Sequence, residues 1–476
     1  MKQNFIAGEW VDGVGAEANI NPSDTSDVIG EYALADVAQT EQAIEAAHQA
    51  LPGWANSPIQ QRSDMLDKIG NEILARKEEL GELVSREEGK TLPEGIGEAG
   101  RAGQIFKYFG AEALRLGGEV FDSVRPGVDV SITRSPVGVV GLILPWNFPI
   151  AIPAWKVAPA LAYGNCVVFK PAALVPATAH VMSEIIVNAG VPEGVFNLVM
   201  GSGSKVGATI VNHPKVNAIS FTGSVPTGRG VAAAAVARTA KVQLEMGGKN
   251  PLVILDDADL ATAVECAVNG AYFSTGQRCT ASSRLIVTAG IHDKFVAAMQ
   301  ERLSGLVTDH ALKAGTDIGP VVDERQLQQD VDYIQIGIDE GANLVCGGEQ
   351  VTRATQGHFL TPALFTETNN DMRINREEIF GPVASVIRVN DYDEALAVAN
   401  DTEFGLSSGI VTTSLKYSTH FKRHIQSGVT NVNLPTAGVD YHVPFGGTKA
   451  SSYGAREQGA YAKEFYTTVR TAYTLS

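Results

Sequence analysis

Two kinds of hydrophobic spacing divide this chain of 476 residues. Across residues 36–118 apolar positions recur every three to four residues, which predicts amphipathic helices packed as a layer. From residue 137 onward, short β-branched runs alternate with helical segments. These runs are 137–144, 166–170, 195–200, 217–223 and 241–246. Strand and helix alternating in this way predict an α/β fold with a parallel, doubly wound sheet.

A second alternating set follows the first. Its strand-like runs are 251–256, 284–290, 384–390, 406–413 and 428–433. The set predicts a second α/β domain with its own sheet, and the break falls near the Gly247-Gly248 pair.

Two further β-rich segments belong to neither set. In residues 128–134 apolar and polar side chains alternate, and the C-terminal EFYTTVRTAYTLS is rich in β-formers. Isolated strands expose open edges unless another chain covers them, so we predict an oligomerisation arm in a homodimer or homotetramer. The alternative is a small hairpin within one chain. The predicted division is a dinucleotide-binding domain (1–117 and 137–246), a catalytic domain (247–446) and the arm (118–136 and 460–476).

Composition narrows the class of protein. Hydrophobic residues make up 44% and charged residues 19%, as in a folded globular chain, and the net charge of −16 disfavours nucleic acid as a partner. The uncharged stretch 135–155 is long enough to span a bilayer, but its prolines favour a buried strand, a turn and a helix start. We therefore expect no membrane association. The N-terminus lacks an apolar signal segment, which favours a cytoplasmic protein.

The four cysteines differ in their surroundings. Their spacing fits neither a disulfide framework nor a CxxC metal site, so no metal is expected. Cys166, Cys266 and Cys346 lie in apolar or regular segments, whereas Cys279 lies in the polar stretch STGQRCTASSR. A structural cysteine would have apolar neighbours, so Cys279 is the candidate reactive thiol.

Two glycine-containing stretches and one acid are candidate binding or catalytic elements. GSGSKVG (201–207) departs from GxGxxG, and FTGSVPTGRG (221–230) lacks the Lys-Ser/Thr of an ATP-binding loop. The latter still combines a strand, a turn and a helix start, which suits a pyrophosphate. Glu245 ends a predicted strand before two glycines, either as a catalytic carboxylate or as a surface residue at a domain junction.

Six motifs in order resemble those of the aldehyde dehydrogenase superfamily, and the resemblance covers essentially the whole chain. They are PWNF (145–148), FTGS (221–224), EMGGK (245–249), GQRC (276–279), EEIFGP (377–382) and PFGG (444–447). The resemblance implies a Rossmann-type cofactor domain, a second α/β catalytic domain and a small β arm. The expected activity is NAD(P)-dependent oxidation of an aldehyde to a carboxylic acid.

The resemblance also implies three catalytic roles. Cys279 is the nucleophile, Glu245 the general base and the Asn147 amide the oxyanion donor. An aldehyde releases hydride only after a nucleophile makes its carbon tetrahedral, so a thiolate attacks first and leaves a thioester. A carboxylate that activates water is then enough for hydrolysis.

For the cofactor, the resemblance implies contacts from Trp146, Lys170, Ser224, Glu378 and Phe380. Relatives that prefer NAD often carry a glutamate three residues after the lysine, where this chain has Ala173. A carboxylate there would accept the ribose 2′-hydroxyl and repel a 2′-phosphate. We therefore expect NADP to be accepted and preferred, with NAD as the alternative.

For the substrate, longer blocks resemble the group that oxidises α-ketoglutarate semialdehyde (2,5-dioxovalerate). A keto-acid substrate calls for a cation, either Arg278 beside the nucleophile or Arg101 on a predicted helix. Alternatively, Arg278 points away and only favours the thiolate, and Arg101 pairs with Glu98. Aromatic residues then form the apolar walls or simply pack in the core. These are Phe148, Trp155 and Phe445.

Several other functions stay open. Succinate semialdehyde relatives usually carry an arginine six residues before the cysteine, where this chain has Phe273, and a broad-range aliphatic aldehyde dehydrogenase is a further alternative. Glu245 argues for hydrolysis over transfer to CoA, and no histidine near Cys279 supports a phosphate-dependent reaction. A catalytically silent binding homologue would be expected to have lost one of the three catalytic residues.

Overall fold

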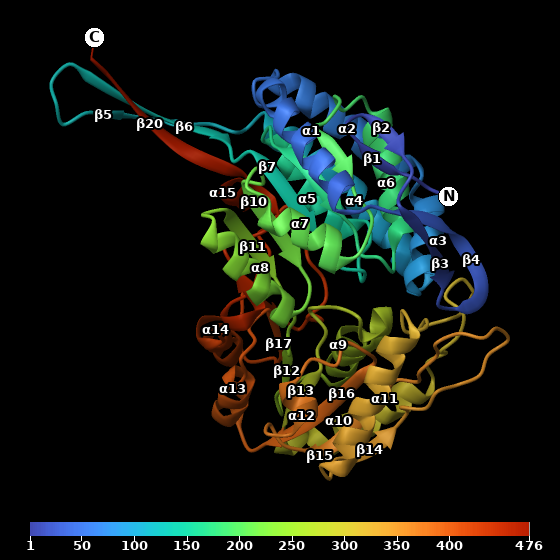
Figure 1. Cartoon of the computed structure of the whole chain (residues 1–476). Helices are drawn as coiled ribbons and strands as arrows, with labels where there is room; N and C mark the ends of the chain where they lie inside the picture. The colour runs from blue at the N-terminus through green and yellow to red at the C-terminus, as the bar shows by residue number, and fades with distance from the viewer. Residues whose placement is uncertain (476) are drawn as a thin grey trace.

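The computed structural model describes residues 1–475, which contain two large sheets and a protruding arm (Figure 1). The first sheet has eight strands in the order β19-β11-β10-β7-β8-β9-β1-β2. Its five parallel strands are β7 (Val139–Ile143), β8 (Cys166–Lys170), β9 (Phe196–Leu198), β10 (Ala218–Thr222) and β11 (Lys241–Glu245). The predicted doubly wound α/β sheet is confirmed.

Helices cover this sheet, which is why its strands are almost continuously apolar. Those between the strands are α5 (Ala151–Ala162), α6 (Pro176–Asn188), α7 (Ala208–Asn212) and α8 (Val225–Ala237), and a π-helical turn (Gly203–Gly207) precedes α7. The N-terminal helical layer consists of α1 (Val37–Ala55), α2 (Ile59–Ala75), α3 (Lys77–Glu88) and α4 (Leu92–Ala113).

The strand order reverses next to β7, which lies between β10 and β8. The chain passes from β7 outward through β8 and β9, then returns to place β10 on the other side of β7. Open α/β sheets bind ligands at the carboxyl ends of the strands at such a switch point. PWNF follows β7 and FTGS begins with the last two residues of β10, so both motifs lie at this end of the sheet.

The second sheet has seven strands in the order β14-β15-β16-β13-β12-β17-β18, and all but β14 are parallel. The strands are β12 (Pro251–Ile254), β13 (Arg284–Thr288), β14 (Asn343–Cys346), β15 (Ala363–Thr368), β16 (Val383–Val389), β17 (Ser407–Val411) and β18 (Val429–Val432). The helices are α9 (Leu260–Tyr272), α10 (Ala289–Ser304), α11 (Glu324–Asp339), α12 (Arg373–Arg376), α13 (Tyr392–Asn400) and α14 (Leu415–His424).

The arm is a three-stranded sheet in the order β20-β6-β5, and it projects from the body of the molecule (Figure 1). Its strands are β5 (Glu119–Asp122), β6 (Val128–Pro136) and β20 (Thr467–Leu475), and the short helix α15 (Lys463–Tyr466) precedes β20. Val120 is 82% exposed and Leu475 76%. The predicted domain boundaries stay predictions. The edge strand β19 (Ser452–Tyr453), which joins the first sheet, lies outside all the predicted ranges.

Four N-terminal strands were not predicted. They are β1 (Asn4–Ile6), β2 (Glu9–Val11), β3 (Gly15–Asn21) and β4 (Asp24–Leu34). The uncharged stretch 135–155 forms the end of β6, the buried strand β7, the turn PWNFP and the start of α5. None of the helices within residues 1–475 has both the length and the apolar composition needed to cross a membrane.

Candidate active site

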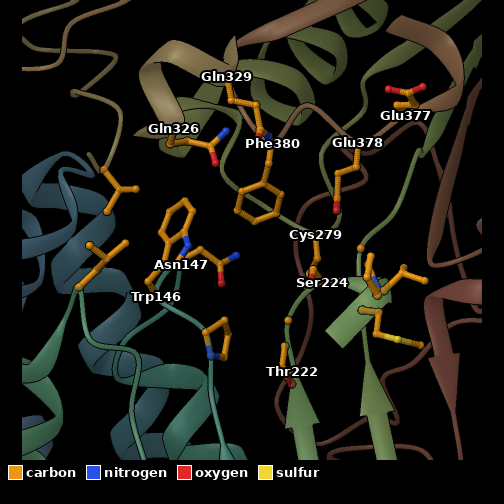
Figure 2. Close-up of a pocket in the computed structure, with 18 of the residues that line it drawn as sticks. Trp146, Asn147, Thr222, Ser224, Cys279, Gln326, Gln329, Glu377, Glu378 and Phe380 are labelled. Atoms are coloured by element: carbon orange, nitrogen blue, oxygen red, sulfur yellow. The ribbon is translucent and has the colours of Figure 1, made fainter. Parts of the chain in front are cut away.

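A cavity of about 620 Å³ opens between the PWNF, FTGS and EEIFGP segments (Figure 2). Its walls include Trp146, Asn147, Ser224, Cys279 and Phe380, which come from both sheets' loops. In Figure 2, the rings of Trp146 and Phe380 lie next to each other, and Cys279 lies below Glu378. Six of the residues assigned by resemblance therefore share one site: these five and Glu378.

A strained turn positions Cys279. The preceding Ser274, Thr275 and Gly276 all have left-handed backbones, with φ of 51°, 57° and 66°. Consecutive residues of this kind persist only where the surroundings hold them. A Cβ on Gly276 would lie 2.2 Å from the carbonyl oxygen of Gly381, so the nucleophile turn packs directly against the EEIFGP loop.

Burial, together with the negative charges of Glu245 and Glu378, raises the pKa of the Cys279 thiol to about 12. Without a bound cation the residue is therefore a neutral thiol at neutral pH. Because only the thiolate is nucleophilic, the site needs a group that takes the proton.

Asn147 is tied to the nucleophile segment. Its Nδ2 donates a hydrogen bond of 3.0 Å to the backbone oxygen of Gln277, two residues before Cys279. A carboxamide nitrogen carries two hydrogens, so one of them remains for an oxyanion. The structure thus brings together the predicted nucleophile and the predicted oxyanion donor.

Glu245, at the end of β11, is directed elsewhere. Its Oε2 accepts a 2.6 Å hydrogen bond from the Ser452 hydroxyl on β19, and within residues 1–475 it forms no hydrogen bond to Cys279. Burial raises the pKa of Glu245 well above its usual range, and the neighbouring Glu457 raises it further. A carboxyl group with a raised pKa is suited to accept a proton near neutral pH.

Glu457 belongs to a buried polar network behind Glu245. It contacts the ammonium group of Lys156 on α5, and Lys156 Nζ also donates a 2.7 Å hydrogen bond to Ser220. Two buried carboxyl groups therefore lie near one buried ammonium group. Sequence reasoning missed Ser452 and Glu457 because both lie more than 200 residues from Glu245 in the chain.

The two glycines of EMGGK allow three functional groups to touch. A Cβ on Gly247 would lie 2.0 Å from Glu378 Oε2, and one on Gly248 would lie 2.8 Å from the Cys279 carbonyl oxygen. The Gly248 N–H donates a 2.9 Å hydrogen bond to Glu378 Oε1. Burial raises the pKa of Glu378 to about 7.

Phe380 has a left-handed backbone with φ of 67°, and its ring meets Trp146 edge to face at 5.3 Å. Helix α11 holds this loop, because Nε2 of Gln326 and of Gln329 both donate to the carbonyl of Ile379, at 3.0 and 2.9 Å. Both glutamines line the cavity (Figure 2). The spacing of α11 contained no signal that these two positions would face a site.

The walls near α8 fit a dinucleotide. Ser224 is the N-cap residue of this 13-residue helix; apart from Pro226, which has no N–H, the residues of its first turn offer N–H groups that suit phosphate oxygens. The Thr222 hydroxyl is buried in the wall without a partner among residues 1–475. At the end of β8, Lys170 Nζ donates to the Pro171 oxygen at 2.9 Å, and burial lowers the pKa of Lys170 to about 8. Ala173 is exposed.

The two candidate arginines differ in their contacts. Arg278 Nη2 donates to Glu94 at 3.2 Å and to Ser274 at 3.0 Å, and Nη1 donates to the Asn269 oxygen at 3.2 Å. Arg101 is partly buried, and burial lowers its pKa. Within residues 1–475, no hydrogen bond of its guanidinium group affects that pKa. The expected alternative, pairing of Arg101 with Glu98, is not what the structure shows: Glu98 accepts from Lys90 instead.

The three predicted wall aromatics are well packed. The Phe148 ring lies 4.0 Å from the Lys90 ammonium, and the Trp155 and Phe445 rings are 5.6 Å apart. As far as residues 1–475 describe it, the cavity is lined by none of these three, nor by either arginine. The predicted substrate contacts therefore lie outside this cavity and remain predictions.

Comparison with known proteins agrees with this geometry. The model of the aldehyde dehydrogenase family matches residues 10–472. Among curated proteins, the chain is 43% identical to the α-ketoglutaric semialdehyde dehydrogenase of Bacillus subtilis, over 99% of this chain and 97% of that protein. It is 42% identical to the α-ketoglutarate semialdehyde dehydrogenase of Haloferax volcanii, over 99% and 98%.

Among solved structures, betaine aldehyde dehydrogenase from Staphylococcus aureus in complex with NAD⁺ superposes with a TM-score of 0.97 at 33% identity, covering 100% of this chain and 95% of that one. An NADP-dependent enzyme from E. coli superposes equally well, with a TM-score of 0.97 at 34% identity and coverage of 100% and 98%. The fold, the shared motifs and the full-length matches agree, and the chain belongs to the aldehyde dehydrogenase family.

Proposed function

We propose that this aldehyde dehydrogenase oxidises α-ketoglutarate semialdehyde to α-ketoglutarate, with Cys279 as nucleophile, Asn147 as oxyanion donor and Glu245 as base. The names of the B. subtilis and H. volcanii relatives support this substrate. The observation that carries the catalytic assignment is the hydrogen bond between Asn147 and Gln277, which keeps an amide N–H beside the thiol.

The reaction begins when Cys279 loses its proton to Glu245 and its sulfur attacks the aldehyde carbon. The second amide hydrogen of Asn147 then stabilises the new oxyanion, a contact whose loss typically costs ~10²–10³-fold in rate. When bound, the oxidised nicotinamide dinucleotide supplies the hydride acceptor. Glu245, having released its first proton, takes another from the water that attacks the thioester, and the Cys279 thiolate leaves.

Glu245 has to rotate away from Ser452 to reach this water, because its side chain is directed toward β19. Glu245 and Cys279 are both buried, and they are close enough for the Glu245 charge to raise the pKa of Cys279. This proximity supports the role of Glu245 as base. In this assignment the hydrogen bond from Ser452 holds Glu245 near the thiol in the resting enzyme and leaves its carboxylate able to accept a proton.

Arg101 is the better candidate for the substrate carboxylate. The guanidinium group of Arg278 is already occupied by Glu94, Ser274 and Asn269, whereas Arg101 is near enough to Arg278 to lower its pKa. A guanidinium group with uncommitted donors can bind a carboxylate through two hydrogen bonds. We therefore assign the clamp to Arg101.

Preference for NADP over NAD is also part of the proposal. Ala173 leaves no carboxylate where a 2′-phosphate would lie, and Lys170 offers a cation beside it. The exposed apolar side chains of the arm support association with a second copy of the chain, as a dimer or tetramer.

Initial rates of NADPH and NADH formation test the proposal. They should be measured with α-ketoglutarate semialdehyde, succinate semialdehyde and a neutral aliphatic aldehyde, for wild type, Cys279→Ala and Arg101→Met. Arg115→Met serves as the control, because Arg115 is exposed and pairs only with Glu112. Cys279→Ala should be inactive. Arg101→Met should raise KM for the two acidic substrates and leave the neutral aldehyde unchanged. A preference of wild type for the neutral aldehyde would contradict the substrate assignment.

A further inference from the structure

Lys90 is a buried ammonium group that none of the assigned roles uses. It lies between α3 and α4, is 1% exposed, and donates to Glu98 Oε2 at 2.6 Å and to the backbone oxygen of Asn147 at 2.8 Å. Glu88 Oε2 lies 3.7 Å away. Burying a charged group costs free energy unless the group is paired. The hydrogen bonds of Lys90 to Glu98 and to the Asn147 carbonyl therefore offset the cost of burying its ammonium group.

Glu98 extends the contact along the chain. While Oε2 accepts from Lys90, Oε1 accepts from the backbone N–H groups of Ile150 and Ala151, at 3.0 and 3.1 Å. Those N–H groups belong to the start of α5 and have no partner within that helix. The Lys90–Glu98 pair therefore holds both ends of the segment 147–151, at a carbonyl and at two amides.

The other neighbour of Lys90 contacts the nucleophile segment. Glu88 Oε1 accepts from Gln277 Nε2 at 3.4 Å, and the backbone oxygen of Gln277 accepts from Asn147 Nδ2 at 3.0 Å. Asn147 is thus fixed at its carbonyl by Lys90 and at its side chain by Gln277. Lys90, Glu98 and Glu88 together contact the loop of the oxyanion donor and the loop of the nucleophile, although burial raises the pKa of Glu88 to about 8 and so leaves Glu98 as the main counter-charge of Lys90.

Lys90 stays charged in this setting. Burial by itself would lower its pKa, but Glu88 and Glu98 outweigh burial and raise it. The positive charge therefore persists at neutral pH, close to the peptide group whose side chain faces the thiol.

We propose that Lys90 is a positioning residue for Asn147: through the Asn147 carbonyl, and together with Glu98, it fixes the peptide so that the free amide hydrogen points at the developing oxyanion. The proposal rests on the role of Asn147 proposed above. The alternative is that Lys90 only joins two helices to a loop and contributes to folding.

A double-mutant cycle separates these two roles, because residues that act through one interaction have non-additive effects. Lys90→Met, Asn147→Ala and the double variant are compared by kcat/KM and by the isotope effect with an aldehyde deuterated at its reacting carbon. Lys107→Met is the control, since Lys107 is partly exposed and pairs with Asp67 at the surface. Tm and the Kd for NADP are measured for every variant.

Asn147→Ala should lower kcat/KM by ~10²–10³-fold, and Lys90→Met by about tenfold to a hundredfold, as expected for a misplaced catalytic group. The double variant should be no slower than Asn147→Ala. In all three variants the Kd for NADP should equal that of wild type, and the isotope effect should be larger than in wild type. If the effects of the two single substitutions on kcat/KM multiply in the double variant, Lys90 does not act through Asn147 and the positioning role is overturned. The oxyanion role of Asn147 would still stand. A fully active Asn147→Ala would instead refute the oxyanion role itself.

Lys90→Met leaves two buried carboxyl groups without their partner, so it can fail to fold. Glu98→Gln then takes its place in the cycle. The carboxamide keeps an oxygen for the Ile150 and Ala151 N–H groups and removes the charge that holds Lys90. Non-additivity with Asn147→Ala supports the proposal, and additivity overturns it.

Discussion

The Ser452 hydroxyl donates a 2.6 Å hydrogen bond to Glu245, so the expected base is held against the edge strand β19. This bond lowers the pKa of Glu245, in opposition to the larger effect of burial.

Ser452→Ala should move the acid limb of the pH–rate profile to higher pH. Without the hydroxyl, the pKa of Glu245 rises further, and a larger fraction of the base is protonated at any given pH. The measurement is kcat against pH for wild type and variant. Ser414→Ala, which removes an N-cap hydroxyl on α14, is the control and should leave the profile unchanged.

Glu457→Gln should move the same limb in the opposite direction. The Glu457 charge raises the pKa of Glu245, so its removal lowers that pKa. The substitution also takes away the negative partner of the Lys156 ammonium group, whose positive charge then favours ionised Glu245. Activity should therefore persist to lower pH than in wild type. A shift toward higher pH would show that the two carboxyl groups do not interact as described.

The Cys279 thiol should be slow to react with iodoacetamide in the cofactor-free enzyme. Because burial raises its pKa to about 12, the rate of inactivation should keep rising with pH through the range where an ordinary thiol has already levelled off. Mass spectrometry identifies the alkylated residue, and Cys279→Ala is the control. A plateau below pH about 9 would mean that the free site holds a thiolate.

Ala173→Glu should shift the cofactor preference toward NAD. The new carboxylate would repel a 2′-phosphate and accept the ribose 2′-hydroxyl. The ratio of kcat/KM for NADP to that for NAD should fall by at least about tenfold, because juxtaposed like charges cost several kcal/mol. Ala173→Gln, which has nearly the same size without the charge, should shift the ratio much less.

Val120→Asp and Leu475→Asp should reduce the molar mass in solution. Both side chains are exposed on the arm, at 82% and 76%, so the substitutions cost the single chain little. Light scattering after size-exclusion chromatography gives the mass, with Leu415→Asp on α14 as an exposed control. An unchanged molar mass would show that these two side chains of the arm do not contribute to an interface between copies of the chain.

The parallel strands could be predicted because burial on both faces leaves an apolar run that is visible locally. The place of strand β1 in the sheet could not, since β1 pairs with β9 and aligns Phe5 with Leu198, far away in the chain. Glycine pairs and motif order identified the residues around the cavity. Polar neighbours of the site were missed for the reason that hid β1: their partners are remote in sequence.

Arg278 illustrates this limit. Next to the nucleophile, it was one of two candidates for binding a substrate carboxylate, and the structure pairs it with Glu94, which lies 184 residues earlier. Lys90, Glu94 and Glu98 would ordinarily be read as solvated positions on a helical face. The rest of the fold buries Lys90 and Glu98 as an internal ion pair and partly buries Glu94 against Arg278, and no local sequence pattern indicates either contact.

The edge strand β19 also bears on how the protein is made. Ser452 and Tyr453 complete the first sheet beside β11, although the other strands of that sheet lie within the first 245 residues. During translation, the N-terminal half can therefore assemble its sheet while the position next to Glu245 is still empty. A nascent chain lacks the hydroxyl that contacts Glu245 until Ser452 has been synthesised, so most of the first sheet can form before the Glu245 side chain has its hydrogen-bond partner.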